Sequence, residues 1–506
     1  MQYFVYFLFS CLMLVSCGAN HPQVPSSYHN VAEAPHLMPD YSDVVVPFNI
    51  APLNFTVDEE GIEKCVAKVT YPGGEMTFGQ VKEILFNLDD WKSMLNAAKG
   101  DSLSVQLFAK REGEWICYPT FYISVSTDPI DPFVSYRLIP PSYTTYEQIY
   151  LCQRNLENFE EKLIYNNQMI DDVEGGHCVN CHAFQNYHTD RMQFHVRAEF
   201  ASTVIYDNGK AKKVNLNRNG AISAGVYPAW HPTLNVLAYS MNMSYQNFHT
   251  SYHGKVEVQD SQAGLMFYDN EHDQVKVICN EPDQLSAFPS WSPDGEYLYY
   301  STAHFAFMDS VAMEQASNIN YAYQHELIDR YTEVEYDIVR RKFDAERLEF
   351  GPAEMVWEAS ASGLSATVPR ISPDGRYLLV GLGDYGTFHI WHPEADLYVA
   401  DLAAQSDTLS YYPLTEANSP CAESFHNWSS NGRWIVFESR RDDGNYTRLY
   451  FSYFDREGRA HKAFELPQST SDYELMNLKS YNIPEFTTEP VKTTPQRLAR
   501  VIQSHE

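Results

Sequence analysis

Short runs of alternating apolar and polar residues dominate the chain, and polar or Gly-bearing turns separate them. A period of two is typical of half-buried β-strands. Across residues 41–140 the runs VVVPFNI, CVAKVTY, SLSVQLFAK and ICYPTFYISVS predict a small β-sandwich of immunoglobulin or fibronectin type. A helical patch over 89–99, with Trp91 facing inward, interrupts these strands.

The pattern changes in residues 141–190. Apolar residues recur there close to a helical period, which predicts a helix over roughly 145–165 that ends before Gly175 and Gly176. We expect this helical segment to lead directly into the sequence Cys178-Val-Asn-Cys181-His182.

From about residue 190 the chain repeats itself. The stretches YPAWHPTLNVLAYS, FPSWSPDGEYLYYS, VPRISPDGRYLLVG and FHNWSSNGRWIVFE begin at Tyr227, Phe288, Val368 and Phe425. In most copies an Asp-Gly or Asn-Gly turn supplies positive φ, and a half-buried strand follows it. One such unit cannot bury both of its faces, so the units are expected to stack around an axis.

We therefore predict a mainly β fold whose residues 191–490 form a β-propeller of five to seven blades, with six expected. A helical excursion over 304–336 accounts for the long spacing between the second and third copies. A strand over 481–487 is expected to close the ring, and residues 491–506 form a C-terminal tail.

The N-terminus indicates export. Residues 1–17 combine an apolar run with Leu14-Val15-Ser16-Cys17, which resembles the lipobox of bacterial lipoproteins. Lipid on Cys17 would anchor the protein to a membrane, and residues 18–40 read as a linker rich in Pro. Because no acidic cluster follows Cys17, a periplasm-facing anchor is favoured over the cell surface.

Composition narrows the possible functions. The chain carries 66 acidic and 36 basic residues, a formal charge of −30, and no basic run. This excludes nucleic acid as an expected partner, because duplex binding needs a basic face. We find no GxSxG, HExxH or P-loop motif, so an enzyme is not the favoured interpretation.

Cys178, Cys181 and His182 match the CxxCH motif that attaches a c-type haem: two thiols bind the vinyl groups and the histidine binds iron. A structural disulfide, other redox thiols and a metal site remain alternatives. His195 is the first candidate for the sixth iron ligand and Met192 the second, although His195 could equally be a packed propeller histidine. Cys65 and Cys117 could pair, but the sequence leaves the connectivity of Cys65, Cys117, Cys152, Cys279 and Cys421 open.

The repeats resemble the WD40-like propeller repeat of the TolB-like type, most specifically at Trp291-Ser-Pro-Asp-Gly295. More widely, segments such as VPFNIAPLNF, DPIDPFVSYRLIPP, CVNCHAF and LGDYGTFHIWHPEADLYVADL resemble a family of bacterial envelope lipoproteins with such a propeller and this CxxCH. The resemblance spans nearly the whole chain and implies architecture more than activity.

Two functions follow as hypotheses. The first is a membrane-anchored lipoprotein with one covalent haem c, which exchanges electrons with an envelope partner that docks on the propeller. The second is a haem-free propeller that binds a protein or glycan and in which the CxxC is structural.

Overall fold

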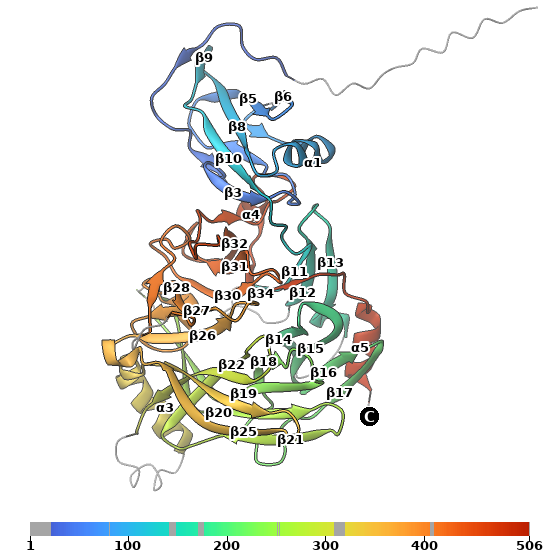
Figure 1. Ribbon diagram of the computed structural model, residues 1–506, viewed down its shortest axis with the longest axis vertical. Helices are drawn as coiled ribbons and strands as arrows, with labels where there is room; N and C mark the ends of the chain where they lie inside the picture. Colours follow the sequence, from blue (N-terminus) through green and yellow to red (C-terminus); the bar gives the residue numbers. More distant parts are fainter. Residues whose placement is uncertain are drawn as a thin grey trace, which may run out of the picture.

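A computed structural model describes residues 22–79, 81–140, 148–170, 177–249, 251, 254–307, 319–404 and 409–504. Cys17, Gly175 and Gly176 lie outside these ranges. The fold is mainly β, as predicted, and has an N-terminal β domain followed by a β-propeller (Figure 1).

The N-terminal domain contains two sheets and helix α1 (Leu88–Ala97). The Asn87 side chain accepts from the amides of Asp89 and Asp90 and so caps α1. Trp91 is fully buried, as predicted, and its Nε1 donates to the Ile50 carbonyl at 3.0 Å. The larger sheet contains β1 (His29–Asn30), β3 (Val44–Pro47), β5 (Ile62–Tyr71), β6 (Gly74–Phe78), β8 (Ser102–Arg111), β9 (Glu114–Cys117) and β10 (Phe121–Ser126), and the smaller contains β2 (Leu37–Met38), β4 (Phe55–Val57) and β7 (Glu83–Ile84).

Two expectations for this region need correction. The linker predicted over 18–40 is partly structured, because β1 pairs with β9 and β2 pairs with β4. Cys65 and Cys117 are both free thiols. Cys65 lies in the main core, whereas Cys117 packs in a separate small cluster with Val66 and Phe108, so the two do not pair.

The propeller has six four-stranded blades, two of which are joined by one parallel bridge between Ala263 and Leu285. The innermost strand of each blade contacts the innermost strands of both neighbours, which closes the ring (Figure 1). From the innermost strand outward, the blades are β34 (Ser480–Thr487), β11 (Phe133–Ile139), β12 (Tyr150–Asn155) and β13 (Glu161–Asn166); β14 (His177–Gln185), β15 (His188–Ala198), β16 (Ser202–Asp207) and β17 (Lys210–Val214); β18 (Val226–Trp230), β19 (Val236–Phe248), β20 (Val256–Asp269) and β21 (Gln274–Cys279); β22 (Gln284–Trp291), β23 (Tyr297–His304), β24 (Asp337–Asp344) and β25 (Glu349–Trp357); β26 (Ser365–Ile371), β27 (Tyr377–Gly383), β28 (Asp396–Asp401) and β29 (Tyr411–Pro413); β30 (Glu423–Trp428), β31 (Trp434–Ser439), β32 (Arg448–Tyr453) and β33 (Phe464–Glu465).

The first of these blades, hereafter the closing blade, joins the two ends of the propeller sequence. The C-terminal β34 pairs antiparallel with β11, so the strand expected over 481–487 does close the ring. The propeller consequently begins near residue 133, inside the predicted sandwich, and not at 191. The helix predicted over 145–165 is wrong, because β12 and β13 form a hairpin there. Ile149 and Leu151 lie two residues apart and pack in the same buried cluster, as residues on one face of an extended chain do.

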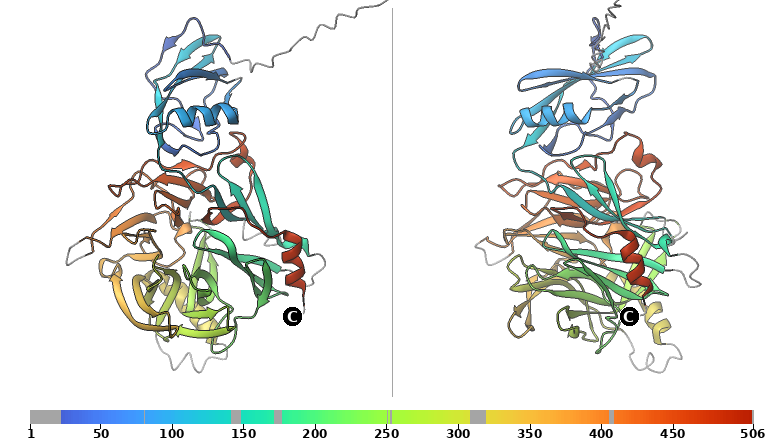
Figure 2. Two further views of the ribbon diagram at one scale, coloured as in Figure 1. Left: turned by 45° about the vertical axis from the view of Figure 1, so that its right-hand side comes forward. Right: turned by 90° about the vertical axis from the view of Figure 1, so that its right-hand side faces the viewer.

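The predicted helical excursion is present, and the expected C-terminal tail contains a helix that was not predicted. Within the predicted excursion over 304–336, the described part contains helix α3 (Ile319–Arg330). The expected C-terminal tail is a docked helix, α5 (Pro495–Gln503), whose Leu498 and Ile502 are buried against the closing blade and the blade of β14. Figure 2 shows α5 lying along the outer edge of these two blades.

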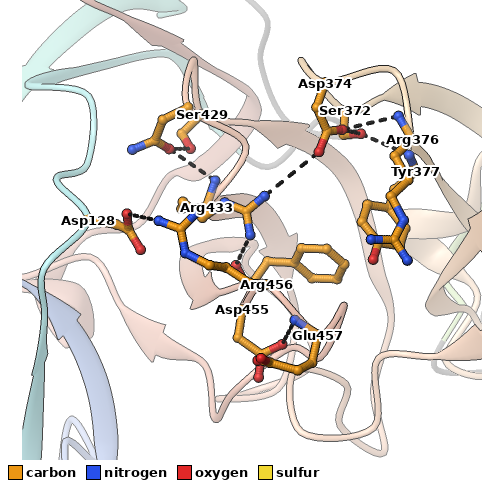
Figure 3. Close-up of polar contacts among 12 residues, drawn as sticks. Asp128, Ser372, Asp374, Arg376, Tyr377, Ser429, Arg433, Asp455, Arg456 and Glu457 are labelled. Carbon is orange, nitrogen blue, oxygen red and sulfur yellow. Dashed lines mark hydrogen bonds and ion pairs between the residues drawn. The ribbon is translucent and has the colours of Figure 1, made fainter.

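The predicted hairpin turns form between the first and second strands of the repeated blades. Ser372 and the amide of Arg376 both donate to the Asp374 carboxylate, and Gly375 has a φ of 74° (Figure 3). The Ser372 hydroxyl also accepts from the Tyr377 amide at 2.9 Å. The turn is therefore held by its own side chains, which explains why this short motif recurs.

The N-terminal domain packs on the outer part of the blade of β30–β33, hereafter the interface blade (Figures 1 and 2). One buried cluster includes Leu103 and Ile130 from the N-terminal side with Trp434 and Phe451 from the interface blade. Polar contacts surround it, and Figure 3 shows Arg456 extending to Asp128 at 3.1 Å. The shared apolar core should make the two parts unfold together.

Candidate functional site

The CxxCH motif lies on β14, the innermost strand of its blade, and not on a helical linker. Cys181 has a φ of 49° and forms a bulge at which the pairing of β14 with β15 shifts. One residue of every other innermost strand has the same left-handed conformation, with φ between 47° and 54°. These residues, hereafter the axial ring, are Cys181, Tyr227, Phe288, Val368, Phe425 and Ile483.

The repeated bulge explains half of the motif. Cys181-His-Ala-Phe occupies the same slot in its blade as Tyr227-Pro-Ala-Trp, Phe288-Pro-Ser-Trp and Phe425-His-Asn-Trp occupy in theirs. His182 therefore corresponds to His426, whose Nε2 lies 2.8 Å from the Val368 carbonyl. The sequence already contained a sign of this equivalence, because the four repeats identified from sequence begin at axial-ring residues. The stretch CHAF was not recognised as a further copy because it lacks the Pro and the Trp that most of the others carry.

A cavity of about 600 Å³ opens along the propeller axis on the side of the strand-connecting turns. Cys181 and His182 line it, together with other members of the axial ring, whereas Cys178 is not part of the lining. Its size falls in the range of small-molecule sites, roughly 300–1,000 Å³.

The two thiols of the motif are free and do not form a disulfide. Cys178 is half-buried against the apolar cluster between the closing blade and the blade of β14, and the Asn180 amide lies 3.2 Å from its sulfur. Cys181 is buried in the axial ring. The two thiols thus have different surroundings: Cys178 packs against the cluster between two blades, and Cys181 lies in the axial ring.

His182 is buried, with 2% of its side chain exposed. Burial and the nearby Arg137 guanidinium lower the pKa of His182 to about 3, so the ring is neutral at physiological pH. The Ser135 carbonyl lies nearby, yet neither ring nitrogen makes a hydrogen bond of good geometry within the described residues. Its Nε2 is 4.0 Å from a carboxylate oxygen of Glu485. An unpartnered neutral imidazole is costly to bury and is the form that binds a metal.

Met192 and His195 both lie on β15, beside the motif strand. They are three residues apart in a regularly paired segment, so their side chains point to opposite faces of the blade. Met192 is paired with Phe184, which contacts the His182 ring, whereas His195 is paired with Asn180. Only one of them can share a face with His182, and the contact through Phe184 places Met192 on that face.

Polar groups fill the axis on the other side of the axial ring. Arg137, from β11, donates to the Val179 carbonyl at 3.3 Å and to the side chains of Asn180 and Asn482. Glu438 accepts from the Ile483 amide and from Asn482. Sequence reasoning missed these residues, because they belong to blades that are distant in the chain and only β34 brings them together.

Burial raises the pKa of Glu438 from an ordinary 4.5 to about 8. Between these pH values the folded state keeps a proton that the unfolded state has lost, so the unfolding free energy falls as pH rises from about 4.5 to 8.

Glu438→Gln keeps the hydrogen-bond acceptor but removes the titrating group. Its unfolding free energy relative to the parent should increase across this window, by at most ~1.4 kcal/mol per pH unit. Denaturant unfolding at pH 5.5 and 8 would measure this, and parallel profiles for both proteins would contradict it, with exposed Glu349→Gln as the control.

A second polar cluster was not foreseen from the sequence. The buried Glu257 carboxylate lies 3.1 Å from the Tyr385 hydroxyl, 3.2 Å from His392 and 3.4 Å from His249. His392 directly follows a short 3-10 helix (His389–Trp391). Over the described ranges, no group of three or more His, Cys, Asp or Glu side chains is placed to hold a metal ion.

Comparison with known proteins gives no family. No family model and no curated protein matches the chain. Among solved structures, a hypothetical selenium-binding protein from Sulfolobus tokodaii has 8% identity and a TM-score of 0.42 over 72% of this chain and 96% of its own. Kuenenia stuttgartiensis hydrazine synthase has 10% identity and a TM-score of 0.32, over 69% and 91% of the two chains. A chain of a nidogen/laminin complex has 7% identity and a TM-score of 0.36, over 67% and 95%.

In the part of the chain that the structure describes, none of the helices is long and apolar enough to cross a bilayer. The predicted lipid attachment at Cys17 lies outside that part. The fold and the site together define a six-bladed β-propeller with an N-terminal β domain, in which Cys181 and His182 of the Cys-Cys-His motif line the axial cavity.

Proposed function

We propose that this protein is a lipid-anchored protein of the bacterial cell envelope that carries one covalent c-type haem and transfers electrons. Cys17 would hold the anchor, with the protein facing the periplasm, and the propeller would serve as the docking scaffold for a redox partner. The observation that carries the proposal is His182, a buried neutral imidazole that makes no hydrogen bond of good geometry within the described residues and follows the two free thiols of the motif.

The residue types fit the chemistry of this group, and Cys178, which packs in the cluster between two blades, would have to turn toward the cavity for both thiols to reach one haem. Cys178 and Cys181 would form the two thioether bonds, and His182 would be the proximal iron ligand. Met192, which lies on the face of Phe184, is the better placed of the two expected sixth ligands, and His195 is the other. Bound haem supplies a one-electron centre, while the chain provides ligation, burial and a surface for docking.

A second candidate is a haem-free propeller that binds a protein or glycan in its axial cavity, with the CxxC structural. The equivalence of Cys181-His182 with the bulge of every other blade favours it, because a blade strand needs this bulge whether or not haem is attached. The cavity itself supplies room for a ligand.

One experiment separates the two candidates. The mature chain would be produced with and without a c-type haem attachment system and then denatured. The haem proposal predicts a Soret absorbance that remains with the polypeptide after denaturation and appears only with the attachment system. Absorbance that is absent, or that leaves the denatured chain on extraction, would refute covalent haem and leave the binding scaffold.

A further inference from the structure

One cation stands in the wall of the axial cavity. Arg370, on β26, is the only Lys or Arg among the residues that line the cavity. It follows the axial-ring residue Val368 by two positions, where the other blades have Ala183, Ala229, Ser290, Asn427 and Glu485. The blade repeat therefore does not require an arginine here.

In the described chain, no carboxylate lies within 4.0 Å of the Arg370 guanidinium. Burial lowers the pKa of Arg370, and Glu485 acts on it only at longer range, where its charge raises that pKa in part. Its Nη1 donates a hydrogen bond to the neighbouring Pro369 carbonyl at 3.1 Å. Glu485 is the only acidic lining residue, but no ion pair within 4.0 Å joins it to Arg370 in the described chain. One carboxylate oxygen of Glu485 instead accepts from the Phe184 amide at 2.9 Å, and the other faces His182. A half-buried guanidinium left in this state has donors available for an anion from outside the chain.

The floor of the cavity is apolar and largely aromatic. The Tyr227 and Phe288 rings lie 4.3 Å apart, and those of Phe288 and Phe425 lie 6.3 Å apart. Val368 and Ile483 complete this side of the axial ring. Such a floor favours a flat apolar group, since aromatic rings pack face to edge or offset against one another.

These two features define one ligand chemistry. We infer that the axial cavity binds a carboxylate carried on a flat apolar group, with the carboxylate on Arg370 and the apolar group on the axial ring. A planar guanidinium matches a carboxylate in a two-bonded geometry. Because the described lining offers one cation, it balances the single charge of a carboxylate better than the two charges of a phosphate dianion.

Two sources could supply this carboxylate. One is a propionate of the haem proposed above, and for that source the inference rests on the proposed function. The other is a free aromatic carboxylate, for which the site needs no haem. The site itself is the same in both cases, so it can be tested first in protein made without the attachment system.

The test uses calorimetric titration of the haem-free protein with 2-naphthoate and with its uncharged analogue 2-naphthamide. Naphthoate should bind, and Arg370→Gln should weaken it at least ~10-fold while changing naphthamide binding little. Arg376→Gln is the matched control, because Arg376 lies in the following turn and pairs with Asp401 at 2.8 Å, outside the cavity lining. Circular dichroism and melting would establish that both variants fold.

Three results would overturn the site: no binding of naphthoate by the folded parent, an equal loss of naphthoate affinity in both arginine variants, or naphthoate binding that Arg370→Gln leaves unchanged.

A second experiment, on haem-loaded protein, identifies the source of the carboxylate. If haem-loaded protein no longer binds naphthoate, haem occupies the cavity and its propionate is the carboxylate. If loaded protein still binds it, or if haem never attaches, the site serves a free ligand, so failure of the haem proposal does not remove the first result.

Discussion

Replacing Cys178 or Cys181 by alanine should abolish stable covalent haem on a chain produced with the attachment system. In the proposed attachment each thiol would form one of the two thioether bonds, and a c-type site normally needs both. Haem staining after denaturing electrophoresis measures the effect, with the double variant as the baseline. We expect no haem-stained band from the double variant. Either single variant should give at most a faint band compared with the parent.

Cys279→Ala is the matched control for these variants. Cys279 is another buried free thiol, on the outer strand β21 of a different blade, and its loss should leave the haem band unchanged. His182→Ala should alter the absorbance of the loaded protein more than any other histidine change. A low-spin spectrum that survives Met192→Ala but not His195→Ala would reverse the order in which the structure places the two sixth-ligand candidates. Full staining of the double cysteine variant would contradict the attachment chemistry.

The repeated turns made most of the propeller predictable from sequence. Ser372-Pro-Asp-Gly375 and its copies hold their own backbone, so a short motif reports a complete local structure. The strands after these turns form where they were predicted, but β27 and β31 are buried at every position and not half-buried as their alternation predicted. Local side-chain chemistry of this kind needs no knowledge of distant parts of the chain.

The start of the propeller was not predictable by the same route. β12 and β13 are stabilised by β11, and β11 in turn pairs with β34, more than 300 residues away in sequence. No local pattern records that pairing, and two short strands on either side of a hairpin imitated a helical period. Tertiary pairing decided the structure where propensity was ambiguous.

For the candidate site too, local sequence predicted one part of the structure and tertiary contacts decided the other. The residues of the CxxCH motif were identified from their spacing, but their surroundings were not. The contacts of His182 with Arg137 and Glu485, and the position of Arg370 beside the other residues of the axial cavity, exist only in the closed ring. Residues from different blades meet at the axis only after six repeats have assembled, so their contacts are absent from any single stretch of sequence.

Trp434→Ala should destabilise the N-terminal domain and the interface blade together. The Trp434 side chain is fully buried in the cluster that both share, and its Nε1 lies 3.4 Å from the Asp128 carbonyl of the N-terminal side. Removing so large a side chain from a core typically costs ~3–5 kcal/mol of unfolding free energy. Hydrogen exchange followed by mass spectrometry resolves the loss segment by segment, and strands β5 and β8 should lose protection along with β31 and β32.

Trp357→Ala is the control that gives this result its meaning. Trp357 is also buried, but it lies on the outer strand β25, where it packs against Tyr411 with ring centroids 4.4 Å apart. Its replacement should destabilise the neighbouring blades and leave the exchange of β5 and β8 close to the parent. If Trp434→Ala likewise spares β5 and β8, the shared cluster does not couple the two parts, and the N-terminal domain is a separate folding unit. If β5 and β8 lose protection together with β31, the N-terminal domain is held rigidly to the interface blade. The common core then transmits the loss of stability to both parts.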